Sequence, residues 1–423
     1  MTAAATTART YDGGLTRRQV VMWRNALFVV FGLSGLGMAT WLGRVPAIRD
    51  ILGASTLEMG LLVTGLSVGS IVGITLSSHV IARLGARRTV LVSLVVAAVG
   101  LVVAGLSADL GVGFAGIVLG LAVFGFGNGT CDVAMNVSGA AAERVLGRTV
   151  MPLFHAAFSL GTMVGALISA GAERAGVAVS LHVSVLAVVI AAVTVVVTRW
   201  MQSEDLGHGA ADQLDDAAAP GGWRSRLAVW STPGTLLIGL IVLGMATAEG
   251  SANDWLALAM VDGHGLSNSG GAVVFFVFVT AMTVARVAGS PLLDRFGRVP
   301  MLRLSAAAAI VGLLLVIVAP APWLAVVGVV FWGFGSALGF PVGLSAAADD
   351  SRNAAARVSA VATIGYVAFL AMPPIIGFLG EHVGLLNGLY VVLVLIVVAG
   401  LASGAAREPG RQARGSSAPQ ATE

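Results

Sequence analysis

Lysine is missing from this chain of 423 residues, and all 24 of its basic residues are arginine. A phosphate-binding loop of the Walker type requires a lysine, and so does an enzyme that forms a Schiff base with its substrate. The sequence therefore excludes both kinds of chemistry within this chain.

Cysteine and histidine are also scarce. Cys131 is the single cysteine, so neither an internal disulfide nor a cysteine-based metal site can form. None of the six histidines stands four residues from another, which excludes the zinc motif HExxH. We see neither a metal cluster nor a catalytic nucleophile in the sequence, and we expect no cofactor, no metal and no enzymatic activity.

Charged residues are also few. Only 11% of the residues are charged and 57% are hydrophobic, whereas a soluble domain carries about 25% charged residues. Apolar runs of about 20 residues, long enough to cross a bilayer, recur from end to end. The chain is therefore expected to be an all-α membrane protein surrounded by lipid. Its excess of arginine then reflects membrane topology, and we expect no nucleic-acid partner.

The apolar runs predict twelve transmembrane helices, with an error of a few residues at each end. The even number places both termini on one side of the membrane. The predicted spans are 25–44, 58–82, 89–107, 112–141, 150–171, 178–198, 233–258, 270–293, 301–319, 322–346, 358–379 and 384–404.

The arginines indicate which side the termini occupy. With the termini inside, only Arg44, Arg49 and Arg174 lie at the outer face and Arg286 lies within a span. All the other arginines are then in the tails or inner loops, as the positive-inside rule requires. The composition is typical of a GC-rich bacterial genome. We therefore expect a multi-pass protein of the bacterial inner membrane with cytoplasmic termini.

The chain also divides into two similar halves. A long polar stretch, 199–232, reads as a cytoplasmic linker between six-helix bundles at 21–198 and 233–405, and 1–20 and 406–423 read as cytoplasmic tails. The sequence Gly-Met-Ala-Thr occurs at 37–40 and again at 244–247, and Gly-Phe-Gly occurs at 125–127 and at 333–335. These nearly equal offsets predict two pseudo-symmetric bundles that arose by duplication.

Two basic loops occupy equivalent places in the halves. The loop after the eighth span reads Gly289-Ser-Pro-Leu-Leu-Asp-Arg-Phe-Gly-Arg298. It resembles the signature loop of the major facilitator superfamily, a family of membrane transporters. The loop after the second span keeps the arginines but has Ala82 where the signature has Asp. The resemblance implies charged gates at the cytoplasmic side, although these arginines can also serve only to set topology. The implied gating residues are Arg83, Arg87, Arg88, Asp294, Arg295 and Arg298.

A second resemblance lies in the fourth and fifth spans. Gly129-Thr-Cys-Asp132-Val-Ala-Met-Asn136 and the segment from Leu153 to Gly161 are similar to motifs of the fucose permease group of sugar:proton symporters. Asp132 falls at the membrane glutamate of that group, Asn136 at its asparagine and His155 at its glutamine. The first-helix aspartate of the group is absent, because Leu42 stands there.

Helical rise places these polar residues deep in the membrane. Asp132 lies about 15 Å from the inner end of its span, and Asn136 lies one turn further in on the same face. On the antiparallel fifth span, His155 lies near the depth of Asn136 and Ser159 near that of Asp132. A carboxylate in such a low-dielectric setting binds a proton readily, so Asp132 and His155 are candidates for proton coupling. A purely structural Asp–His pair is the alternative.

The seventh span carries a second acidic group. Glu249 and Asn253 share a face, and Glu249 lies about 24 Å from Pro233, in the outer third of the predicted span. It is a further candidate for proton coupling, or it pairs with Arg44. Asp254 is expected near the outer interface, in a solvated position. The candidate substrate-binding residues are Asn136, Ser159 and Asn253, with Trp41 and Trp332 as surfaces on which a sugar can stack.

These observations predict a secondary transporter that works by alternating access. Proton-coupled uptake of a sugar or another small polar solute is the leading function, and proton-driven efflux of drugs or metabolites is the alternative. The antiporter motif of the fifth span, G-x-x-x-G-P-x-x-G-G, has proline after its second glycine, whereas Gly165 is followed here by Ala166, which counts against efflux. The expected partners are a small-molecule substrate and protons, and the expected state is a monomer.

Overall fold

The computed structural model describes residues 15–147, 150–203, 229–347, 349 and 354–408. Within these residues the chain is helical and contains no β-sheet. The helices are α1 (Arg17–Leu42), α2 (Val45–Leu52), α3 (Thr56–Asp109), α4 (Phe114–Leu146), α5 (Met151–Arg174), α6 (Val179–Val197), α9 (Pro233–His264), α10 (Asn268–Phe296), α11 (Arg298–Val318), α12 (Pro322–Ser336), α13 (Gly339–Ala347), α14 (Ala354–Val383), α15 (Leu385–Gly388) and α16 (Tyr390–Ala402).

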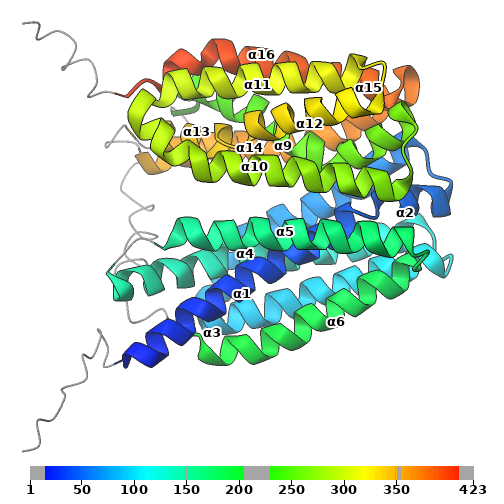
Figure 1. The fold of residues 1–423 in the computed structure, drawn as a ribbon. Helices are drawn as coiled ribbons and strands as arrows, with labels where there is room; N and C mark the ends of the chain where they lie inside the picture. Colours follow the sequence, from blue (N-terminus) through cyan, green and yellow to red (C-terminus); the bar gives the residue numbers. More distant parts are fainter. Residues whose placement is uncertain (1–14, 148–149, 204–228, 348, 350–353, 409–423) are drawn as a thin grey trace, which may run out of the picture. The chain divides into compact units, whose positions relative to one another are not determined.

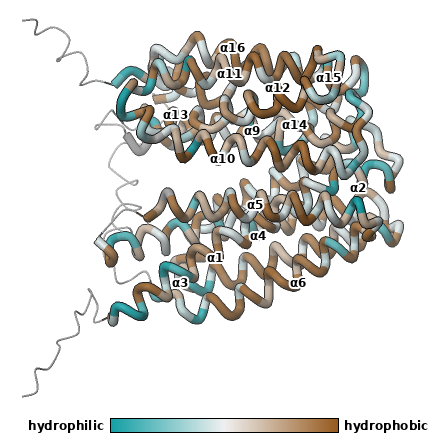
Figure 2. Tube along the Cα trace, in the orientation of Figure 1, coloured by the Kyte–Doolittle hydropathy of each residue, from teal (hydrophilic) through white to brown (hydrophobic). Residues whose placement is uncertain are grey.

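The predicted membrane-spanning helices are present. The described residues contain 11 helices that are long and apolar enough to cross a membrane. One of them, α3, has 54 residues and leaves helical geometry at Gly85, so its two arms match the predicted spans 58–82 and 89–107. Figure 2 shows the apolar residues along the helices and the hydrophilic residues mainly at their ends. The twelve predicted spans and the all-α membrane fold are thus confirmed.

The two signature loops turn in the same way. Gly85 has φ 76° and ψ 156°, and Gly297 has φ 86° and ψ 169°. Residues with a side chain rarely adopt positive φ, so glycine is required at both turns. The equal conformations support the internal repeat that the sequence predicts.

Local signals explain other helix ends. Thr16 with Gln19 and Ser55 with Glu58 form capping boxes at the starts of α1 and α3, which satisfy backbone N–H groups that lack helical partners. The short helix α2 is an element that the hydropathy pattern did not predict. It begins beside Pro46 and ends at Gly53, which is left-handed with φ 58°.

Close contacts divide the described chain into two compact units, each described here by itself. Unit 1 contains the described residues up to Ser203, together with Asn253–Val279 and Pro373–Leu385. Unit 2 contains residues 229–252, Thr280–Met372 and the described residues from Leu386 onward. Most of the predicted linker and of both predicted tails lies outside the described residues. The ends of each helix are called inner and outer according to the orientation that the arginines predict.

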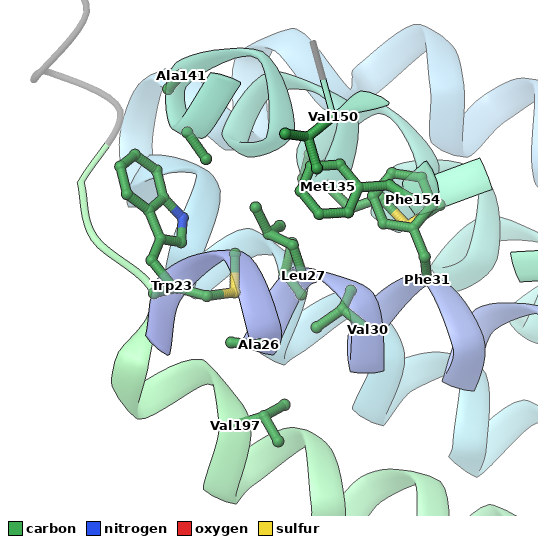
Figure 3. Packing of buried hydrophobic residues seen from close by; sticks show 14 of the residues in the cluster. Trp23, Ala26, Leu27, Val30, Phe31, Met135, Ala141, Val150, Phe154 and Val197 are labelled. Carbon is green, nitrogen blue, oxygen red and sulfur yellow. The ribbon is translucent and has the colours of Figure 1, made fainter. Parts of the chain in front are cut away.

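The inner part of unit 1 has a well-packed core. Figure 3 shows Trp23, Leu27 and Phe31 of α1 among side chains of α4, α5 and α6. The rings of Phe31 and Phe154 stack with their centroids 5.5 Å apart. The Trp23 indole N–H donates to the Ser138 hydroxyl at 3.0 Å, so this buried polar atom is satisfied. The cluster holds α1 against α4 and α5, the helices that carry the candidate site.

Glycines let α1 and α5 approach closely, and Figure 1 shows the two helices side by side. A Cβ atom added at Gly161 of α5 would lie 1.9 Å from the carbonyl oxygen of Gly32 in α1. Helices in membranes rely on such small residues for tight packing. A side chain at Gly161 must therefore push these two helices apart.

We expect Gly161→Ala to lower the thermal stability of the purified protein, because overpacking costs about 1–3 kcal/mol. Gly171→Ala is the matched control, since a Cβ atom there, in the same helix, has nothing within 4 Å. Thermal unfolding in detergent measures both variants. Equal melting temperatures would show that the α1–α5 contact adapts to a larger residue.

Candidate transport site

Asp132 lies in the middle of α4, about 27 Å from its outer end and about 21 Å from its inner end. Its side chain is partly buried. The Asn136 amide N–H donates to the Asp132 backbone carbonyl at 2.8 Å and approaches a carboxylate oxygen at 3.4 Å. Within the described part of the chain, no cation forms an ion pair with this carboxylate. Among the described residues its hydrogen-bonding partner is thus Asn136, in a setting where ionisable groups are costly.

The predicted partners on α5 occupy different environments. His155 is exposed and its ring lies edge-on to Phe31, with centroids 5.3 Å apart, whereas Ser159 is buried. A Cβ atom at Gly139 of α4 would lie 3.4 Å from the Phe154 ring. Helices α4 and α5 run in opposite directions. Asn136 on α4 and His155 on α5 therefore both lie on the outer side of the contact between Gly139 and Phe154. The arrangement agrees with the predicted depths, and the pairing of His155 with Asp132 stays a prediction.

Unit 2 contains a second charged group within the membrane. The Arg286 guanidinium of α10 forms an ion pair with Glu249 of α9 at 2.8 Å. The prediction that Glu249 pairs with Arg44 is wrong, because Arg44 forms an ion pair with Glu173 at 2.7 Å and donates to the Val177 carbonyl at 2.6 Å. Both arginines therefore have partners that the sequence spacing did not indicate.

The seventh span was predicted too short at its outer end. Helix α9 continues to His264, beyond the predicted end at 258. Glu249 consequently lies near its middle, about 24 Å from Pro233 and about 22 Å from His264. Asp254 lies about 15 Å inside the outer end and is partly buried, as is Asn253. The expectation of a solvated Asp254 at the interface is corrected.

The two candidate stacking tryptophans are fully buried. Trp41 and Trp332 each have 0% exposure. The Trp332 indole N–H donates to the Ala248 carbonyl at 3.1 Å, which ties α12 to α9 in unit 2. Neither ring presents a surface to a solute in this conformation, so their contact with substrate stays a prediction that requires the surrounding helices to move.

The two signature loops differ in their contacts. Arg83, Arg87 and Arg88 of the first loop are exposed, and none of the ion pairs found among the described residues involves them. In the second loop, Arg298 donates to both carboxylate oxygens of Asp349, at 2.5 Å and 3.2 Å. Asp294 and Arg295 are exposed, with Arg295 over the Phe296 ring. Of the predicted gating residues, Arg298 is the one that the structure shows in a bidentate ion pair.

Asp349 was not among the predicted gating residues, although the sequence contains a pattern that could have indicated it. It stands with Asp350 directly after the tenth span, at the same inner face as Arg298. An acidic pair facing a basic loop favours an ion pair across the helix ends. Arg298 also donates to the Ser345 hydroxyl at 2.9 Å, which connects the start of α11 with the end of α13.

Unit 1 has a polar cluster at its outer side that the sequence did not predict. Arg49 of α2 forms an ion pair with Asp262 of α9, and Asp50 accepts a hydrogen bond from the Asn268 amide at 2.8 Å. The Thr56 backbone N–H donates to the Glu381 carboxylate at 3.0 Å. These bonds tie α2 and α3 to the outer ends of α9, α10 and α14. We call this set the outer latch.

Charge reversal tests whether the outer latch opens during transport. We expect Asp262→Arg to slow transport about tenfold, the equivalent of about 1.4 kcal/mol in a rate-limiting step, because it places two cations side by side. The exchange of charges in Arg49→Asp/Asp262→Arg should restore more than half of the rate. Initial uptake rates measure both variants. If the single reversal leaves the rate unchanged, the latch takes no part in the transport cycle.

The fold and these charged groups define a membrane transporter: two repeated sets of spanning helices, with ionisable side chains near the middle of the long helices α4 and α9. The chain belongs to the Major Facilitator Superfamily, whose family model matches residues 27–367 and, in a second match, 255–421. The resemblance to this superfamily seen in the sequence is therefore confirmed.

Similar proteins agree with this assignment. The chain is 28% identical over 376 residues to an uncharacterised transporter of the same type from Yersinia pestis, covering 88% of this chain and 93% of that one. A crystal structure of the nucleoside transporter NupG is similar with a TM-score of 0.72 at 13% identity, covering 91% of this chain and all of the other. The Escherichia coli fucose:proton symporter FucP gives a TM-score of 0.61 at 13% identity, over 92% and 100% of the two chains.

Proposed function

We propose that this transporter is a proton-coupled symporter that takes up a sugar or another small polar solute by alternating access. The observation that carries the proposal is Asp132, a carboxylate in the middle of α4 whose polar neighbour is Asn136. A carboxylate that lacks a cationic partner in the membrane favours its protonated form. Substrate binding beside it, or exposure to water, can then change its proton affinity.

The roles of the neighbouring residues follow from their chemistry. Asn136 can both donate to and accept from a solute hydroxyl, and Ser159 adds a hydroxyl of its own. His155, which is exposed, can pass a proton between Asp132 and water. We assign further solute contacts to Trp41 of the first half and to Asn253 and Trp332 of the second half, once the helices around them move. We assign a second proton site to Glu249.

The similarity of motif adds support for a sugar-like solute. Asp132, Asn136 and His155 stand where the fucose permease group has its glutamate, asparagine and glutamine. FucP, whose fold is similar, is described as a fucose:proton symporter. Asp and Glu carry the same acid group, so the substitution at Asp132 preserves proton binding while shortening the side chain by one methylene.

Proton-driven efflux of a drug or metabolite is the second candidate. It uses the same carboxylates with the opposite direction of solute movement. The Gly165-Ala166 sequence of α5 lacks the proline of the antiporter motif, which favours uptake. We therefore rank symport first.

Uptake into proteoliposomes tests the proposal. A panel of radiolabelled sugars and polyols is offered with an imposed pH gradient, acidic outside, and then with no gradient. Symport predicts accumulation of at least one solute above its external concentration only when the gradient is present. Accumulation driven by the reverse gradient would instead establish antiport.

A further inference from the structure

The Glu249–Arg286 ion pair lies in the membrane-spanning interior of unit 2. Arg286 is about 15 Å from the inner end of α10, and Glu249 is near the middle of α9. Their side chains are 34% and 17% exposed, respectively. A pair that only stabilised helix packing would be expected to bury its arginine, as Arg44 is buried at 3% exposure beside Glu173. The side chain of Arg286 is instead the more exposed member of its pair.

The tenth predicted span is broken next to this arginine. Helix α12 ends at Ser336 and α13 begins at Gly339, although the hydropathy pattern predicts one helix over 322–346. Pro341 has no N–H group with which to bond the carbonyl of Ala337, four residues earlier. The Arg286 Nε–H donates to that carbonyl at 3.3 Å. Broken helices of this kind form the substrate and ion sites of many transporters.

These contacts use two of the three nitrogen atoms of the Arg286 guanidinium. Nε is used by the Ala337 carbonyl and Nη2 by Glu249, whereas Nη1 makes no hydrogen bond within the described residues. Arginine binds carboxylates through two parallel N–H donors. The Nη1 and Nη2 edge therefore suits a carboxylate once Glu249 gives up its bond to Nη2.

We propose that Arg286 binds a carboxylate group of the transported solute, and that Glu249 occupies this position on the guanidinium when no solute is bound. The substrate class is then a small hydroxylated acid, such as a sugar acid. This inference rests on the proposed function, of which it specifies the substrate, and it gives Glu249 a defined part in proton coupling.

Charge balance explains the coupling. An anionic solute that enters while Glu249 is ionised places two carboxylates beside one guanidinium, which is costly in this setting. If the solute enters with a proton on Glu249, the site keeps one cation and one anion. The other charged side chains described in unit 2 lie at the inner ends of its helices, and Tyr366 of α14 is the titratable group at mid-helix.

A matched panel of acids and neutral solutes tests the inference by binding, without a need for transport. Thermal shift of the purified protein compares D-gluconate, D-glucuronate and L-lactate with sorbitol, D-glucose and 1,2-propanediol, their uncharged counterparts. We expect one acid to raise the melting temperature while its counterpart does not. If no acid stabilises the protein more than its counterpart, the inference is overturned.

Two variants separate substrate binding from a structural role. Glu249→Gln removes the competing charge and should tighten binding of that acid about tenfold, whereas a purely structural pair predicts weaker binding or none. Glu249→Gln/Arg286→Gln removes both charges, leaves no unpaired ion, and should fold but lose the preference for the acid. Retention of the preference in this double variant contradicts the inference.

The outcomes also separate this inference from the proposed function. If an acid binds through Arg286 but its rate and extent of uptake do not depend on the pH gradient, the inference stands and proton symport fails. If neutral solutes accumulate with the gradient and no acid is preferred, symport stands and the acid site fails.

Discussion

We expect Asp132→Asn to abolish pH-driven accumulation of the substrate while exchange of substrate across the membrane continues. The substitution keeps the size and hydrogen-bonding shape of the side chain beside Asn136 and removes its ability to gain or lose a proton. Each pH unit is worth about 1.36 kcal/mol, a factor of ten in accumulation. With a gradient of two pH units, the wild type therefore accumulates up to about 100-fold for one coupled proton, and the variant stays near equal concentrations.

The measurement compares accumulation with counterflow in the same proteoliposomes. Counterflow needs binding and helix movement but no net proton transfer, so it reports whether the variant is folded and active. Asp132→Glu, the residue type of the fucose permease group, is the matched control and should retain accumulation. Accumulation by Asp132→Asn at the wild-type level would place the coupled proton elsewhere, first at Glu249.

We expect Arg298→Ala to produce the second large effect, on the rate of turnover. It removes the bidentate bond to Asp349 and the bond to Ser345, which connect the start of α11 with the end of α13. Charge-assisted pairs of this geometry are among the stronger hydrogen bonds. We expect turnover to fall about tenfold, an increase in barrier of about 1.4 kcal/mol, while equilibrium binding of the substrate changes little.

Asp349→Asn should reproduce the loss, because it weakens the same pair from its other side. Arg87→Ala in the first loop is the matched control, since Arg87 is exposed and belongs to none of the ion pairs found in the described residues. Initial rates of uptake and a binding isotherm are measured for all three variants. Normal turnover in both Arg298→Ala and Asp349→Asn would leave the second loop with a role in topology alone.

Much of the fold was predictable from the sequence, because the bilayer imposes one strong constraint. Each span needs about 20 apolar residues, and backbone polar groups must be satisfied within a helix. The loop glycines Gly85 and Gly297 were predictable as well, since a tight turn between antiparallel helices requires positive φ. The position of Asp132 well inside its helix followed from helical rise alone.

Other features were not predictable from hydropathy. The window that ended the seventh span at 258 did not detect the further helical turns of α9 up to His264, because those turns contain Asp262 and His264. That error placed Glu249 and Asp254 closer to the outer end of the helix than they are. The break at Ala337 had a signal in Pro341, which the apolar composition of the span concealed.

Pairing between distant residues was the least predictable feature. The choice of Glu173 by Arg44 and of Glu249 by Arg286 depends on the rotation of each helix about its axis, and one sequence does not reveal that rotation. The outer latch depends in the same way on where Asp262 and Glu381 project beyond the apolar segments. The partners of these charged side chains can be identified only from a structure.

The central claim is that the solute enters together with a proton carried by Asp132. Recording the proton movement that accompanies solute entry tests this claim most directly. Proteoliposomes with a weakly buffered exterior and no imposed gradient receive a pulse of a transported solute, and the external pH is recorded. Symport through Asp132 predicts that the exterior becomes more alkaline in the wild type and that the Asp132→Asn variant gives no change. Solute entry without alkalinisation in the wild type, or an undiminished signal in the variant, would contradict the account.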